Sequence, residues 1–216
     1  MDTLKFIANR WNLDLSGSLP IKIKISRFLS FISLLKDLGV EEGAEIGVCT
    51  GRYSQKLLEG IPDLRLHCID PWEPYSEYVE SKVEKLGFNK LYNNTLGRLK
   101  GRNCVIYKKY SMDAVKEFKD NSLDFVFIDG NHSFRYAVDD IAEWSKKVRP
   151  GGIVSGHDYW MSVDVKKPWK REMTAEDKIM LCQVKEAVDA WTRAHHIKPW
   201  FIITGDKCPT WFWVKE

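Results

Sequence analysis

Apolar residues along most of this chain fall into short runs that alternate with longer amphipathic stretches. The central run ends at a glycine-containing turn at 47–51, and four later runs predict strands at 64–70, 104–107, 123–129 and 153–155. Their apolar residues are almost continuous, as in strands that are buried on both faces of a parallel sheet. The sequence between these strands is long enough for a helix in each case.

The intervening stretches have apolar positions at helical spacing. One predicted helix leads into the central strand and stops at Gly39; its apolar stripe consists of Phe28, Leu29, Ile32, Leu35 and Leu38. Further helices are predicted after residue 51, within 75–100, and at 114–118, 136–147 and about 175–195. Strand and helix therefore alternate through most of the chain.

The C-terminal end follows a different pattern. Two β-rich runs at 200–204 and 210–214 are joined by only five residues, which predicts an antiparallel hairpin. The whole order predicts an α/β fold: a doubly wound, Rossmann-like, mostly parallel sheet of seven strands, with helices on both faces and this hairpin at the end. Residues 1–40 are expected to form an N-terminal helical cap, and residues 41–216 the main domain.

Composition excludes several classes of protein. The 33 basic and 30 acidic residues leave a net charge of +3, so nucleic acid is not a favoured partner. The five cysteines are dispersed, which is typical of reduced thiols rather than of a disulfide framework or zinc module. A cytoplasmic protein without a membrane partner is expected, because the sequence shows neither a signal-peptide pattern nor an apolar run of ~18 residues. Residues 1–40 could serve a homodimer contact.

Polar residues follow four of the predicted strands: Glu45, Asp70, Asp129 and the pair His157–Asp158. In doubly wound sheets, ligands bind beyond the carboxyl ends of the strands, and a carboxylate at the second strand can bind ribose hydroxyls. The turn at 47–51 lacks the middle glycine of a dinucleotide fingerprint. The negative charge of Glu45 would attract an ammonium group and repel a pyrophosphate. These features predict a pocket for a cationic nucleoside.

The stretch Glu45 to Gly51 resembles motif I of class I S-adenosylmethionine (SAM)-dependent methyltransferases, and Asp70 resembles their ribose-binding acid. The final hairpin is similar to the antiparallel strand pair of that family. More specifically, residues 127–134, 148–159 and 211–214 resemble the methyltransferase 24 group, which includes bacterial O-methyltransferases of sugars and natural products. The resemblance covers roughly residues 40–216 and implies that 41–216 form a SAM-dependent methyltransferase domain.

The resemblance also implies where SAM, the expected cofactor, would bind. The residues expected around its methionine, ribose and adenine parts are, in that order, Glu45 with Gly47 and Gly51, then Asp70, then Ser111 with Met112; Asp129 would lie at the same site.

A metal site and a catalytic base are implied in the same way. In the metal-dependent macrolide-sugar methyltransferases that the chain resembles here, the positions of Asp129, His157 and Asp158 bind magnesium. His157 replaces a carboxylate of those enzymes, and since magnesium prefers oxygen ligands, this favours a softer divalent ion or none. The histidine three residues after the first aspartate is their base. His132 is therefore our first candidate for the base and His157 the second.

The sequence thus predicts an enzyme that transfers a methyl group from SAM to a hydroxyl of a small molecule, such as a sugar or glycoconjugate precursor. A non-catalytic SAM-binding or scaffold protein of the same fold is the alternative, and the missing glycine disfavours an NAD-dependent oxidoreductase. Asp129 could also cap a helix or form a turn, His132 could be an ordinary helix residue, and His157 could be purely structural. The basic residues at 166–171 are either a solvated loop or a lid that attracts an anionic acceptor.

Overall fold

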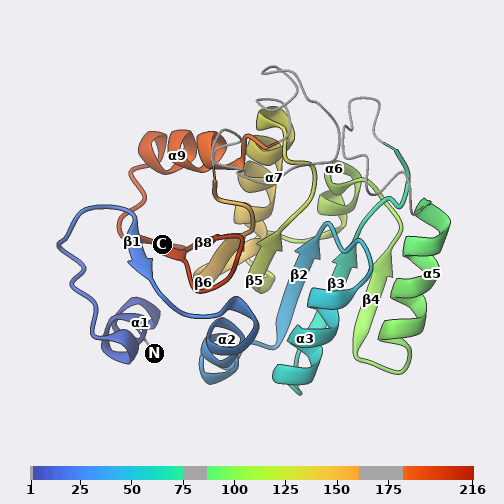
Figure 1. Cartoon of the computed structure of the whole chain (residues 1–216), viewed down its shortest axis with the longest axis horizontal. Helices are drawn as coiled ribbons and strands as arrows, with labels where there is room; N and C mark the ends of the chain where they lie inside the picture. Colours follow the sequence, from blue (N-terminus) through green and yellow to red (C-terminus); the bar gives the residue numbers. More distant parts are fainter. Residues whose placement is uncertain (1, 75–86, 161–181) are drawn as a thin grey trace.

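Eight strands form one sheet in the computed structural model, which describes residues 2–74, 87–160 and 182–216 (Figure 1). The strands are β1 (Ile21–Ile23), β2 (Glu42–Ile46), β3 (Arg65–Ile69), β4 (Cys104–Tyr107), β5 (Leu123–Ile128), β6 (Val148–Gly156), β7 (Trp200–Ile203) and β8 (Thr210–Val214). Their order across the sheet is β1-β7-β8-β6-β5-β2-β3-β4. β8 is antiparallel to β6 and to β7, whereas the other neighbouring strands are parallel.

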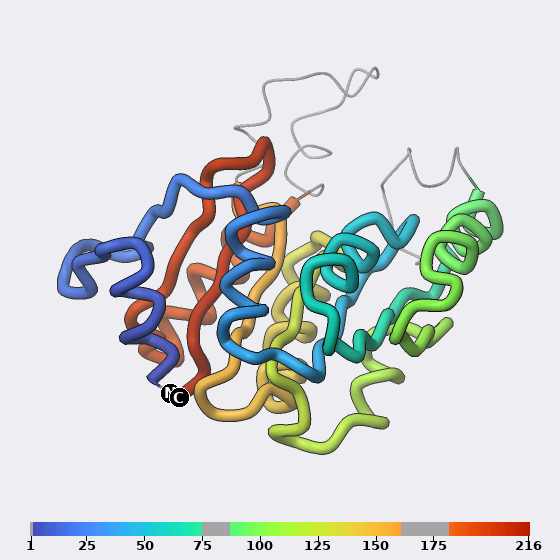
Figure 2. The backbone as a smooth tube through the Cα atoms, turned by 90° about the horizontal axis from the view of Figure 1, so that it is seen from below, coloured from blue at the N-terminus to red at the C-terminus, as the bar shows by residue number. Residues whose placement is uncertain are grey.

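Helices cover both faces of this sheet (Figures 1 and 2). One face carries α1 (Thr3–Trp11), the π-helical turn η1 (Arg27–Phe31), α2 (Ile32–Asp37), α3 (Arg52–Gly60) and α5 (Phe88–Leu99). The other face carries α6 (Ser111–Ala114), the 3-10 turn η2 (Val115–Glu117), α7 (Phe134–Lys147) and α9 (Val184–Ala194). The predicted doubly wound α/β fold is confirmed.

A hydrophobic core lies on each face of the sheet, and successive side chains of a strand enter the two cores in turn. In β5, Phe125 and Phe127 enter the core under α2 and α3, whereas Val126 and Ile128 enter the core under α7 and α9. Each face of the strand is therefore buried, which explains why its sequence is continuously apolar.

The carboxyl ends of β2, β3, β5 and β6 meet at one edge of the sheet, and their backbone hydrogen bonds continue past the strands. The amide of Gly47 donates to the carbonyl of Ile69 at 2.9 Å, and the amide of Asp129 donates to the carbonyl of Ile46 at 2.7 Å. The amide of His157 donates to the carbonyl of Ile128 at 2.9 Å. Side chains from distant parts of the sequence are thus held next to one another at this edge.

The N-terminal region differs from the prediction. The sheet has eight strands rather than seven, because β1 pairs in parallel with β7 and forms the edge of the sheet. Residues 21–23 therefore belong to the main sheet, although the prediction placed them in a helical cap. The division into a cap (1–40) and a domain (41–216) stays a prediction.

The predicted apolar stripe before the central strand is also corrected. Its first turn is the π-helix η1, whose wider turn shifts the side chains relative to α-helical spacing. As a result, Phe28 and Leu29 are 39% and 74% exposed, whereas Ile32 and Leu35 are buried as predicted. Phe31 and Leu34 are buried as well.

The predicted bounds of one strand and two helices can also be compared with the structure. The predicted turn at 149–152 falls within β6, which begins at residue 148, and it coincides with an irregularity in the pairing of β6 with β5, where the register shifts between Val148 and Ile153. Helix α5 lies within the predicted helical region 75–100, and α9 within the predicted 175–195. Residues 75–86 and 161–181, with the basic cluster at 166–171, lie outside the described residues.

Candidate functional site

The turn after β2 requires glycine at two positions. Gly47 has a φ of +88°, and a Cβ atom there would lie 2.0 Å from the carbonyl oxygen of Asp129. Gly51, with a φ of +71°, precedes the first residue of α3 as its N-cap. The turn therefore lies directly against the end of β5 and leads into the N-terminus of a helix, whose first amides face the same space.

Asp70 connects this turn to the end of β3. Its carboxylate accepts hydrogen bonds from the amides of Cys49 at 2.8 Å and Trp72 at 2.7 Å. The indole Nε1 of Trp72 donates back to the carbonyl of Cys49 at 2.8 Å. Burial raises the pKa of Asp70. The predicted ribose contact stays a prediction, and the structure shows in addition that this carboxylate fixes the shape of the turn.

Glu45 is the buried carboxyl group of this region. It is 2% exposed and accepts a hydrogen bond from the hydroxyl of Ser54, in the first turn of α3. Burial raises the pKa of Glu45 to about 8. At neutral pH the group is therefore largely protonated, and a nearby cation would favour its ionised form.

Arg27 of η1 is a further candidate site residue, which was not among those predicted from the sequence. It is 8% exposed, and its guanidinium carbon lies 4.9 Å from the ring centroid of Tyr53 and 5.6 Å from that of Phe127. None of the residues placed by the structure makes a hydrogen bond with its Nε or Nη1 atom. Asp206 holds η1 in place, since its carboxylate accepts a hydrogen bond from the Arg27 amide at 2.5 Å. A single arginine in an apolar segment was the only sequence signal.

Four of the predicted residues come together beyond β5 and β6. The Nε2 atom of His132 lies 3.4 Å from Oδ1 of Asp129 and 3.6 Å from Oδ2 of Asp158. The Nδ1 atom of His157 lies 3.3 Å from Oδ1 of Asp129 and 3.2 Å from Oδ1 of Asp158. Two carboxylates and two imidazoles therefore alternate in one cluster, which we call the His–Asp cluster (Asp129, His132, His157 and Asp158).

The charges in the His–Asp cluster support one another. Burial by itself raises the pKa of Asp129, but the charge and hydrogen bonds of His157 and His132 outweigh it and hold the pKa well below its usual range. The turn before α7 is closed by Asn131, whose side-chain oxygen accepts from the amide of Ser133 at 3.0 Å. The carboxylate of Asp129 thus faces the two histidines.

The donor atoms of this region suit a divalent ion of borderline softness better than magnesium. Asp129, His132 and Asp158 have donor atoms within 4.8 Å of one another, and so do His157, Asp158 and Cys208. Magnesium selects oxygen ligands in an octahedron, whereas these groups offer imidazole nitrogens and a thiol beside the carboxylates. Burial, together with the Asp158 carboxylate, raises the pKa of the Cys208 thiol to about 11. Cys208 was not among the predicted site residues.

A cavity of about 580 Å³ lies beside α6 and α7. It is lined by Pro74, Tyr110, Ser111, Met112, Asn131, Tyr136, Asp139 and Asp140. Ser111 and Met112, the two residues predicted at the adenine, are both in its wall. The hydroxyl of Ser111 donates to the carboxylate of Asp140 and accepts a hydrogen bond from Nε1 of Trp144 at 2.8 Å. Burial raises the pKa of Asp140 to about 7. This buried acid was not among the predicted site residues.

Comparisons with known structures show the same fold in methyltransferases. An O-methyltransferase from Bacillus cereus in complex with S-adenosylhomocysteine (SAH) is 16% identical, with a TM-score of 0.56, over 99% of this chain and 89% of that one. The O-methyltransferase TomG from Streptomyces achromogenes, involved in tomaymycin synthesis and solved with SAM, is 19% identical, with a TM-score of 0.58, over 100% and 91%. An SAH-bound methyltransferase from Podospora anserina is 15% identical, with a TM-score of 0.58, over 89% and 81%.

Sequence comparisons and the helix lengths bear on the class of protein. No curated protein matches the chain at the sequence level. Within the described residues, the helices are all too short or too polar to cross a bilayer. A family model described as a methyltransferase domain matches residues 44–159, which include the turn at 47–51 and the His–Asp cluster. Because this match covers more than half of the 216 residues, the chain belongs to the methyltransferase 24 family.

Proposed function

We propose that this methyltransferase moves a methyl group from SAM to a hydroxyl of a small molecule. The acceptor class that we propose is a sugar or glycoconjugate precursor, because the sequence resembles a group that includes O-methyltransferases of sugars. The observation that carries the proposal is the position of His132. Its Nε2 atom lies in the His–Asp cluster, 3.4 Å from Asp129, and the backbone of Asp129 is packed against Gly47 of the predicted cofactor turn.

Different residues would bind the methionine, ribose and adenine parts of SAM. The ionised form of Glu45 would face the ammonium group of the methionine part, and the guanidinium of Arg27 would supply its two unused nitrogens to the carboxylate. Asp70 fixes the turn and would accept the ribose hydroxyls. Ser111 and Met112 line the cavity that would enclose the adenine. Bound SAM supplies a methyl group on a sulfonium, and the transfer is an in-line displacement that depends on positioning.

The His–Asp cluster would activate the acceptor. A neutral His132 can accept the hydroxyl proton near neutral pH, and the carboxylates of Asp129 and Asp158 then stabilise the imidazolium. His157 is the second candidate for the same role. A divalent ion held by Asp129, His157 and Asp158 would lower the pKa of the hydroxyl, and we propose this ion as an assisting group.

Calorimetry with SAH tests the cofactor part of the proposal. Binding with micromolar affinity that is lost in Asp70→Ala is expected, and no binding at millimolar SAH would refute it. A panel of sugars and nucleotide sugars with labelled SAM then tests transfer. If SAH binds but His132→Ala leaves the biological activity of the protein intact, the non-catalytic SAM-binding alternative is favoured instead.

A further inference from the structure

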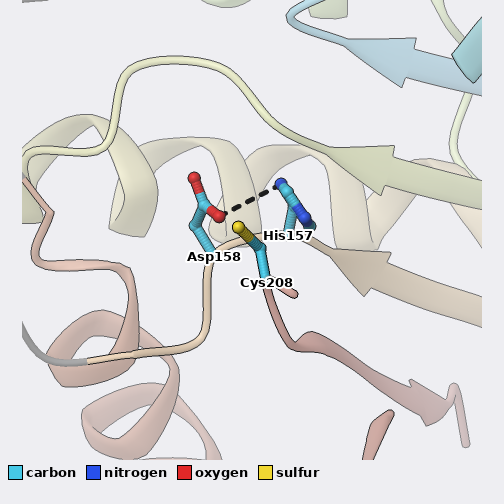
Figure 3. Close-up of side chains that lie close together, drawn as sticks. All are labelled: His157, Asp158 and Cys208. Carbon is cyan, nitrogen blue, oxygen red and sulfur yellow. Dashed lines mark ion pairs between the residues drawn. The ribbon is translucent and has the colours of Figure 1, made fainter. Parts of the chain in front are cut away.

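Cys208 reaches the His–Asp cluster through the pairing of the C-terminal strands. It lies in the connection between β7 and β8, and the register of β8 against β6 places Trp211 opposite Gly156, next to His157. The amide of Tyr159 also donates to the carbonyl of Pro209 at 3.2 Å, which holds the two loops together. Figure 3 shows the sulfur of Cys208 beside the side chains of His157 and Asp158.

The three side chains are arranged as a converging set of metal donors. An imidazole nitrogen, a carboxylate oxygen and the Cys208 sulfur all lie within 4.8 Å of one another. The Nδ1 atom of His157 is 3.2 Å from Oδ1 of Asp158. The other ring nitrogen of His157, Nε2, is buried and has no hydrogen-bond partner among the residues that the structure places. Such a nitrogen is costly to bury unless a ligand satisfies it.

The chemistry of the set selects the ion. Cysteine sulfur, histidine nitrogen and carboxylate oxygen are the three ligand types of protein zinc sites, and three protein ligands leave a fourth position open. Bonds of about 2.0–2.3 Å in a tetrahedron place neighbouring donors about 3.3–3.7 Å apart, which falls within the 4.8 Å that spans the three donor atoms of this set. Magnesium gains nothing from a thiolate and requires a tighter oxygen octahedron.

We propose that His157, Asp158 and Cys208 form a binding site for a thiophilic divalent cation of the zinc type, with an open fourth position. The inference rests on the proposed function and deepens its metal part, since His157 and Asp158 also belong to the ligand set proposed there. It makes Cys208, in place of Asp129, the third ligand, and the thiol decides which ion is bound. Binding to this site requires neither SAM nor an acceptor.

Cobalt(II) titration of the full-length, metal-free protein tests the site, because a cobalt–thiolate bond gives an intense near-ultraviolet charge-transfer band. The wild-type protein should show this band at one equivalent, and excess magnesium should not remove it. Cys208→Ser should lose the band and bind cobalt at least tenfold more weakly. Cys104→Ser, which changes a remote thiol of β4, should keep both.

Two results would overturn the site. The first is a wild-type protein without the band. The second is a band that survives in Cys208→Ser but disappears in Cys182→Ser, since the Cys182 thiol lies 3.4 Å from the carbonyl of Asp158. If Cys208→Ser does not fold, zinc protection of Cys208 against alkylation in the wild-type protein replaces it, and full alkylation in saturating zinc refutes the site. SAH calorimetry in chelator separates this outcome from failure of the proposed function.

Discussion

The Nε2 atom of His132 lies 3.4 Å from Oδ1 of Asp129, three residues earlier in the chain. This geometry makes His132 the group that would take the acceptor proton, with Asp129 orienting the ring. His132→Ala should therefore lower kcat by about 10²–10⁴-fold. The affinity for SAH should change less than about threefold, because His132 is not among the proposed cofactor contacts. Steady-state kinetics and calorimetry measure the two effects separately.

His157→Gln is the comparison for this prediction. Glutamine retains a hydrogen-bonding group beside Asp129 but cannot accept a proton. Because His157 is also a proposed metal ligand, the two variants are compared in chelator. If His157→Gln then costs more kcat than His132→Ala while the folded state and SAH affinity are unchanged, the two histidines exchange roles. Equal loss of SAH binding in both variants would instead mean that the cluster is part of the cofactor site.

The pKa of Glu45 predicts a pH dependence of stability. Burial raises it from an ordinary value of 4.5 to about 8, so the folded protein holds a proton that the unfolded chain has lost between these values. The free energy of unfolding should therefore fall as the pH rises from about 4.5 to about 8, by on the order of 3–5 kcal/mol. Glu45→Gln should lose this contribution, which denaturant unfolding at pH 5, 6.5 and 8 measures.

The same carboxyl group predicts proton release when cofactor binds. An ammonium group beside Glu45 favours its ionised form, so SAH binding at pH 7 should expel a fraction of a proton per molecule. Calorimetry in two buffers with different ionisation enthalpies detects it. Glu45→Gln should bind without this release, and an unchanged buffer dependence in the variant would show that the proton comes from another group.

Gly47 predicts a steric effect at the contact between β2 and β5. In Gly47→Ala the new methyl would meet the carbonyl of Asp129 at 2.0 Å, and alanine would also need a φ of +88°. We expect a loss of about 2–4 kcal/mol of stability and weaker SAH binding. Gly97→Ala in α5 is the matched control, since its methyl would have no neighbour within 4 Å and should stabilise by about 0.5–1 kcal/mol. Thermal unfolding distinguishes the two.

The central part of the sheet could be predicted from sequence, and so could the residues at its edge. Strands buried on both faces have continuous apolar runs, and the carboxyl ends of parallel strands meet at one edge whatever the intervening helices are. Asp129 and the pair His157–Asp158 therefore came together as expected, and Asp70 contacts the turn after β2. Strand β1 did not give such a signal, because it has only three residues and is defined by its pairing with β7.

Other features depend on tertiary contacts that local periodicity does not encode. The π-helical η1 turns Arg27 into the core, and an α-helical pattern wrongly assigns Phe28 and Leu29 to the buried face. Cys208 joins His157 only through the register of β8 against β6, across about 50 residues of sequence. Asp140 is one of several acids on α7, and only the packing of Ser111 and Trp144 shows which one is buried.

The guanidinium of Arg27 predicts opposite effects on stability and on cofactor binding. Two of its nitrogens are buried without a hydrogen bond to any described residue, which costs folding free energy that a bound carboxylate would offset. Arg27→Met keeps an unbranched apolar stem but removes the guanidinium group and its charge. The unliganded variant should therefore be as stable as the wild type or more stable. Its SAH affinity should fall by about 10–100-fold, the loss expected for charge-assisted hydrogen bonds.

Methylthioadenosine is the matched ligand for this prediction, because it retains the adenine, ribose and sulfur of SAH but lacks the amino acid carboxylate. Its affinity should be nearly the same for the wild type and Arg27→Met. Arg27→Lys should recover part of the SAH affinity, since an ammonium group retains the charge without the planar pair of donors. Calorimetry with both ligands gives the comparison. If methylthioadenosine binding falls as much as SAH binding, Arg27 acts by shaping the site and not by binding the carboxylate.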